Sequence, residues 1–98
     1  ARYSVLKPWS VYLLLCQSGR IYTGVAVDPA KRVAQHASGK GARFTRADKP
    51  VRCLVSREFE GRSQALKEEY RIKQLDRSAK LDLVATWQRE GCQGFEVS

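Results

Sequence analysis

Apolar residues in the first third of the chain fall into two short runs with polar turn residues between them. The run at 9–16 is almost continuously apolar, which predicts a strand that is covered on both faces and central in its sheet. The run at 21–27 contains β-branched and aromatic residues and follows a Ser-Gly dipeptide, as is typical of a hairpin. We therefore predict a β-hairpin, preceded by a lead-in at residues 1–8.

The turn of this hairpin decides which side chains share a face. A two-residue Ser-Gly turn would place Tyr12 and Tyr22 on opposite faces. A three-residue loop that also includes Gln17, with its glycine in the left-handed conformation, would pair Leu14 with Tyr22 and put both tyrosines on one face. We predict the three-residue loop, because only this register lets the two tyrosines contribute to one site.

A helix is predicted directly after the hairpin. Asp28 provides an N-cap acceptor, and Pro29 is tolerated at the first helical position, so the helix should run from there to about Ala37. Arg32 and His36 are neighbours at i, i+4, and we expect them to be presented together, away from the main packing face. That packing face is formed by Ala30, Val33, Ala34 and Ala37.

The second half of the chain predicts one more strand and two more helices. The strand covers 51–59, and a helical period follows from Arg62 to about Leu75, with Ser63 as a candidate cap. The last helix should begin with a cap at Asp76 or Ser78 and run to about Glu90.

These elements predict one α/β domain. Ninety-eight residues are enough for a modest core and too few for a second one. We assign the domain to residues 9–90 and a loose C-terminal tail to residues 91–98. The expected architecture is a small, mostly antiparallel sheet of three strands flanked by helices.

Glu69 is the most unusual residue of the helix at 62–75. It lies near the centre of an apolar arc, and a carboxylate in a packing face is unfavourable unless a cation or a metal ion compensates it. The other members of that arc are Ala65, Leu66, Tyr70, Ile72 and Leu75. Glu69 is therefore a candidate functional residue.

The charge balance favours a polyanionic partner. The chain has 18 Lys and Arg against 10 Asp and Glu, a net charge of +8, and nucleic acid is the first candidate for such a surplus. No apolar run approaches the ~20 residues of a membrane-spanning helix, and no signal pattern opens the chain, so we expect no membrane association and a cytoplasmic location. Cys16, Cys53 and Cys92 are widely spaced and lack a CxxC motif, which favours reduced thiols.

Cations gather in the loop-like stretch 38–52. Candidate nucleic-acid contacts there are Lys40, Arg43, Phe44, Thr45 and Arg46, with Lys73 and Arg77 extending the surface. Phe44 could stack on a base and Thr45 could bond to a phosphate, whereas the alternative is an ordinary solvated charged face. Nothing in this stretch indicates base-specific contacts, so we expect recognition of nucleic-acid structure or backbone.

The order of these residues resembles the GIY-YIG nuclease superfamily over about residues 9–84. The chain keeps both tyrosines and the second glycine of the two signature triplets, as Ser-Val-Tyr12 and Tyr22-Thr-Gly24. It looks like the small single-domain bacterial (YhbQ-like) branch and is similar to the catalytic domain of nucleases that cut branched DNA. The downstream matches are Asp28-Pro29-x-Lys31-Arg32-x-x-x-His36, Gly41-Ala42-x-Phe44-Thr45-Arg46 and Ala65-Leu66-x-x-Glu69-x-x-x-Lys73.

The resemblance implies a divalent-metal-dependent endonuclease that hydrolyses DNA phosphodiester bonds. It implies that Glu69 binds one Mg²⁺ or Mn²⁺, with waters and a phosphate oxygen completing the shell. Arg32 would stabilise the charge on the phosphate, and Tyr22 would support the nucleophile or the phosphate. Tyr12 would activate or position the attacking water, with His36 able to take its proton. A base role for Tyr12 requires Arg32 and the metal to favour the phenolate, because a free tyrosine has a pKa of about 10.

Other interpretations remain open at this point. Taken singly, Tyr12 and Tyr22 are ordinary strand residues and Arg32 is an ordinary helix cation. The chain could instead be a nucleic-acid-binding module with little or no turnover, or could act on RNA. DNA, branched or flapped, is the expected partner, and a partner protein could direct targeting.

Overall fold

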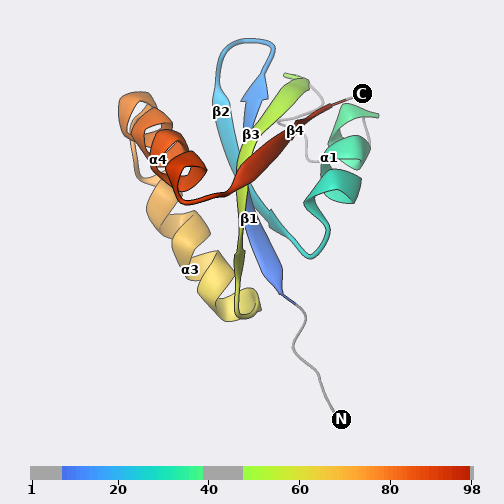
Figure 1. Cartoon of the computed structure of the whole chain (residues 1–98). Helices are drawn as coiled ribbons and strands as arrows, with labels where there is room; N and C mark the ends of the chain where they lie inside the picture. The colour runs from blue at the N-terminus through green and yellow to red at the C-terminus, as the bar shows by residue number, and fades with distance from the viewer. Residues whose placement is uncertain (1–7, 39–47, 98) are drawn as a thin grey trace.

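The structure, a computed structural model, describes residues 8–38 and 48–97, which form an antiparallel sheet with helices on both faces (Figure 1). The strands are β1 (Trp9–Cys16), β2 (Ile21–Ala26), β3 (Pro50–Phe59) and β4 (Gln93–Glu96), and the helices are α1 (Pro29–Ala37), α3 (Arg62–Lys73) and α4 (Arg77–Arg89). The strand order is β2-β1-β3-β4, so β1 is central, as its continuous apolar run predicts. None of these helices is long and apolar enough to cross a lipid bilayer.

The hairpin has the three-residue loop predicted from the sequence. Leu14 pairs with Tyr22 and Tyr12 pairs with Gly24, so the two tyrosines lie on the same face of the sheet. The Cys16 amide donates to the Arg20 carbonyl at 2.9 Å. Gly19 has a φ of +91°, the left-handed conformation expected for the glycine of such a loop.

Two buried clusters, one on each face of the sheet, stabilise the fold. The cluster under α3 and α4 contains Val11, Leu13, Ile21, Val55, Ala65, Ile72, Val84 and Trp87. The cluster under α1 contains Tyr12, Leu14, Ala26, Val33 and Cys53. Alternate residues of β1 contribute to opposite clusters, which explains why its sequence is apolar throughout.

Two of the three helices in the described residues begin at predicted caps: Asp28 caps α1, and Asp76, one of the two candidates with Ser78, caps α4. Asp28 accepts from the Lys31 amide at 3.2 Å, and Asp76 accepts from the Ala79 amide at 2.8 Å. The cap predicted at Ser63 is wrong, because α3 begins after Gly61 without a side-chain cap. Tyr70, expected in the packing face of α3, is 70% exposed.

The expected strand count of three is corrected to four. Residues 91–98, expected to form a loose tail, contain β4, which pairs with β3 and carries an ion pair from Glu96 to Arg52. Its weak sequence pattern has a steric origin at Gly94: a Cβ there would lie 2.0 Å from the Cys53 carbonyl oxygen. The pairing is irregular between Cys53 and Ser56, so the strand needs a residue without a side chain at this position.

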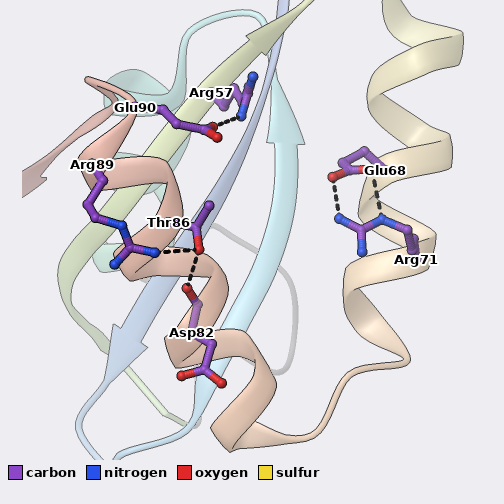
Figure 2. Close-up of polar contacts among 7 residues, drawn as sticks. All are labelled: Arg57, Glu68, Arg71, Asp82, Thr86, Arg89 and Glu90. Carbon is purple, nitrogen blue, oxygen red and sulfur yellow. Dashed lines mark hydrogen bonds and ion pairs between the residues drawn. The ribbon is translucent and has the colours of Figure 1, made fainter.

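Figure 2 shows two surface ion pairs, one between neighbouring elements and one within a helix. Arg57 on β3 pairs with Glu90 at the end of α4 at 2.6 Å, and its guanidinium lies 5.6 Å from the centre of the Trp87 ring. Arg71 and Glu68 form a two-bond contact within α3. Exposed pairs of this kind contribute about 0–1 kcal/mol each, so the two clusters dominate stability.

All three cysteines are free thiols. Cys16 and Cys53 are buried and Cys92, between α4 and β4, is half-buried. Burial raises the pKa of both buried thiols to about 11.

We predict that Gly94→Ala disrupts the docking of β4. The added methyl group would meet the backbone of β3, and we expect a loss of about 1–3 kcal/mol in the free energy of unfolding. Hydrogen exchange should show faster exchange confined to the β3–β4 pairing. Gln93→Ala, an exposed neighbour, is the control, and equal effects of the two changes would contradict the steric explanation.

Candidate active site

The hairpin places a tyrosine ring directly over a glycine. Tyr12 pairs with Gly24 across β1 and β2, and a Cβ at Gly24 would lie 2.6 Å from both Cζ and Oη of Tyr12. This distance is shorter than any normal van der Waals contact, so the phenol can cross the hairpin only where the opposite residue has no side chain. The glycine at position 24, the last residue of the Tyr22-Thr-Gly24 triplet, therefore has a steric reason in the ring of Tyr12.

Tyr12, Tyr22 and His36 meet on the α1 side of the sheet. The Tyr12 hydroxyl lies 3.5 Å from His36 Nε2, and the rings of Tyr22 and His36 meet edge to face with their centres 5.8 Å apart. Tyr12 is 1% exposed and His36 is fully buried, whereas Tyr22 is half-buried. Tyr22 is thus the phenol of the two that reaches the surface.

The expectation that His36 and Arg32 are presented together, away from the packing face, is wrong for His36. His36 lies one turn after Val33 on α1, and both side chains are buried against the sheet. Arg32 remains exposed and donates to Gln35 Oε1 at 3.3 Å. The helix therefore directs His36 inward and Arg32 outward.

The electrostatics of this cluster keep Tyr12 protonated. Burial raises the pKa of Tyr12 well above its usual value, with a further rise from Tyr22, and the nearby Arg32 guanidinium opposes this by its charge and by hydrogen bonding. Burial, and then the charge of Arg32, lowers the pKa of His36. At neutral pH the pair is therefore a neutral phenol beside a neutral imidazole.

Arg32 connects this buried cluster to the surface. It borders a groove of about 350 Å³, together with Ala26, Val27, Asp28, Lys31 and Gln35. Its charge acts on both Tyr12 and His36, although its side chain is exposed. An anion bound in this groove would contact Arg32, the same cation whose charge acts on Tyr12 and His36.

Glu69 lies on the opposite side of the sheet from the tyrosine cluster. It belongs to α3, which packs on the other face, and it pairs with Lys73 at 3.4 Å with its side chain 16% exposed. Lys73 in turn borders a pocket of about 340 Å³ at the outer edge of β2, together with Tyr22 and Arg77. Lys73 therefore contacts Glu69 and lines the same pocket as Tyr22.

Five of the predicted nucleic-acid contacts lie outside the described residues: Lys40, Arg43, Phe44, Thr45 and Arg46. Conversely, sequence analysis missed Arg20, Thr23 and Lys80, which also border the pocket at β2. The spacing of Lys73, Arg77 and Lys80 at i, i+4, i+7 was the sequence signal that could have indicated this pocket. The three residues do not belong to one helix, however, because α3 ends at Lys73 and α4 begins at Arg77.

The donor set suits a metal ion that is bound together with its substrate. Within residues 8–38 and 48–97, no group of three or more His, Cys, Asp or Glu side chains could hold a metal ion. Mg²⁺ is often held by one or two carboxylates, with waters and substrate phosphates completing its shell. The partly buried Glu69 carboxylate fits this mode as a single protein ligand.

Comparison with known proteins identifies the class. A GIY-YIG catalytic domain matches residues 8–82, with the hairpin, α1 and α3 inside the match. The chain belongs to the GIY-YIG family of nuclease domains, which confirms the predicted resemblance.

Individual relatives include several UPF0213 proteins. One from Cupriavidus pinatubonensis is 45% identical over 82 residues, which cover 84% of this chain and 91% of the relative. One from Staphylococcus saprophyticus is 40% identical, covering 76% and 92%. The solution NMR structure of a UPF0213 protein from Bacillus halodurans has 39% identity and a TM-score of 0.53, and the match covers 81% of this chain and 84% of that one. The predicted fold class is thereby confirmed.

The contact between Tyr12 and Gly24 can be tested with a double-mutant cycle. We expect Gly24→Ala to destabilise the protein by about 1–3 kcal/mol, because its methyl group would overlap the phenol ring. In a Tyr12→Leu background the same change should have a much smaller effect, as measured by urea unfolding. Strict additivity of the two changes would show that the ring is not the obstacle.

His36 should make stability depend on pH. Its pKa is lowered in the folded state, so the unfolded chain binds more protons below the ordinary histidine pKa of about 6.5. The free energy of unfolding should therefore be retained above the ordinary histidine pKa of about 6.5 and should fall as the pH drops below it. Urea unfolding of wild type and His36→Gln checks this, because the fall in this window should disappear in the variant.

Proposed function

We propose that the protein is a divalent-metal-dependent endonuclease that hydrolyses DNA phosphodiester bonds and recognises structure or backbone rather than base sequence. The observation that carries the proposal is the grouping of Tyr12, Tyr22, His36 and Arg32 on one side of the hairpin. Membership in the GIY-YIG family and the net charge of +8 support it.

In this proposal Arg32 and Tyr22 contact the substrate. Arg32 is exposed at its groove, and its guanidinium can form paired hydrogen bonds to the phosphate and stabilise the charge that develops there. Tyr22 reaches the surface, so its hydroxyl can orient the attacking water or the phosphate.

Tyr12 and His36 act as positioning residues in this proposal. Both are buried, and the raised pKa of Tyr12 opposes formation of a phenolate. The Tyr12 hydroxyl lies 3.5 Å from Nε2 of the imidazole, and the imidazole ring meets the ring of Tyr22 edge to face. This pair therefore fixes the orientation of Tyr22 relative to Arg32.

Glu69 would hold a single Mg²⁺ or Mn²⁺ ion, which, when bound, polarises the scissile phosphate and shields the leaving oxygen. Its ion pair with Lys73 keeps a cation beside the carboxylate. That ammonium group can bind a phosphate oxygen next to the metal site.

A binding module without turnover is the second candidate function. Two observations favour it: Tyr12 is 1% exposed, and the Glu69 carboxylate already has a cationic partner in Lys73. This candidate predicts salt-sensitive binding to nucleic acid with no metal-dependent product.

The nuclease proposal is tested by incubating the protein with plasmid, flapped and branched DNA in Mg²⁺ or Mn²⁺. We expect cleavage that EDTA abolishes and that Arg32→Ala and Glu69→Gln each reduce by about 100-fold or more, because each removes a group that stabilises the transition state. Parallel assays on matched RNA distinguish the two nucleic acids.

Two matched controls separate catalysis from general charge effects. Glu68→Gln changes the residue next to Glu69. The Glu68 carboxylate pairs with Arg71 on α3 (Figure 2), and we expect this change to leave cleavage nearly unchanged. Arg89→Ala removes an exposed cation on α4 and serves the same purpose for Arg32. Cleavage that survives both Arg32→Ala and Glu69→Gln would falsify the proposal.

A further inference from the structure

A cationic pocket lies at the outer edge of β2, where α3 ends and α4 begins. Its volume is about 340 Å³. In Figure 1, α3 and α4 lie on the face of the sheet opposite α1. The lining residues are Arg20, Ile21, Tyr22, Thr23, Lys73, Arg77 and Lys80. Four of the seven are cations, and Tyr22 is shared with the tyrosine cluster.

The start of α4 is an electrostatically unfavourable position for two of these cations. Arg77 and Lys80 lie at the start of α4, whose first turn has no acidic residue, although the helix dipole disfavours cations there. The carboxylate of Asp76 is engaged as the cap of the same helix. Lys73 has Glu69 as a partner, and the charge of Arg20 acts on Asp48. An anion in the pocket would relieve the repulsion among the cations.

Two of the cations are held in place by neutral groups. Arg77 Nε donates to the Gly19 carbonyl at 3.1 Å, and Lys80 Nζ donates to the Ile21 carbonyl at 3.3 Å. These bonds fix the side chains along β2 without neutralising their charge. Arginine and lysine have further N–H donors, so each can still bind an anion.

Thr23 gives a second, independent indication of a ligand. Thr23 is 2% exposed and borders the pocket. In the described part of the chain, its hydroxyl is the one buried side-chain oxygen or nitrogen without a hydrogen-bond partner. Leaving a buried polar group without a partner costs about 1–3 kcal/mol. A ligand oxygen, or a water held by the ligand, would satisfy it.

We propose that this pocket binds one phosphate-bearing nucleotide of a single nucleic-acid strand, next to Tyr22. The inference rests on the proposed function, since it takes the ligand to be part of the substrate. Guanidinium and ammonium groups are the usual partners of phosphate oxygens, and the volume suits a small ligand rather than a duplex. The phosphate could be a strand terminus or an internal diester.

The test is binding without metal. Fluorescence anisotropy in EDTA compares three DNA probes of one sequence: a 12-nucleotide single strand with a 5′-phosphate, the same strand with a 5′-hydroxyl, and the duplex. Arg77→Gln/Lys80→Gln should weaken single-strand binding about tenfold and lower the slope of log affinity against log salt by about 0.7, for the one phosphate that the pocket binds. Stronger binding of the 5′-phosphate strand would assign the pocket to a terminus, and equal binding to an internal phosphate.

The control is Arg71→Gln/Arg89→Gln, which removes two cations from the surfaces of α3 and α4 drawn in Figure 2. It makes the same change in net charge and should weaken binding less than threefold. An equal loss in the control, or an equal loss for the duplex and the single strand, would overturn the proposal.

Thr23→Val provides a variant that should remain folded. Because the hydroxyl has no partner, we expect stability to be kept or raised while binding weakens about threefold or more. Unchanged binding would contradict the role of the hydroxyl. The binding assay needs neither metal nor cleavage, so a failure of the nuclease proposal would leave its result intact. Conversely, if the Arg77→Gln/Lys80→Gln variant cleaved DNA at the wild-type rate and bound it with wild-type affinity, only the pocket proposal would be overturned.

Discussion

The crossing of the Tyr12 ring over Gly24 is the contact on which the candidate site depends. It requires the three-residue hairpin loop, because only that register sets the tyrosine opposite the glycine. With the ring in this position, the Tyr12 hydroxyl lies near His36, and His36 in turn packs against Tyr22. The absence of a side chain at Gly24 therefore allows the rings of Tyr12, His36 and Tyr22 to pack next to one another.

The two sides of the sheet carry different groups of the candidate site. The α1 side supplies Arg32 and the buried neutral pair, and the α3–α4 side supplies Glu69 and the pocket cations. Tyr22 and the pocket cations meet at β2, which is an edge strand with one strand neighbour. A substrate that contacts both sides would have to pass over this edge, where Tyr22 borders the pocket.

The parts of the fold that follow local rules were predictable from the sequence. The loop register, the caps at Asp28 and Asp76 and the central position of β1 each follow from a few neighbouring residues. β4 was missed because its four residues include a glycine that tertiary contact requires. The burial of His36 and the pocket at β2 were missed because both depend on how far a helix overlaps the sheet, which periodicity does not define.

The distribution of the thiols gives the protein a built-in reporter. Cys16 and Cys53 are buried with pKa values near 11, so the thiolate needed for alkylation is scarce at neutral pH. Cys92 is more accessible and lies between α4 and β4. A fluorophore or spin label would therefore attach selectively at the joint that carries the last strand, without any engineered cysteine.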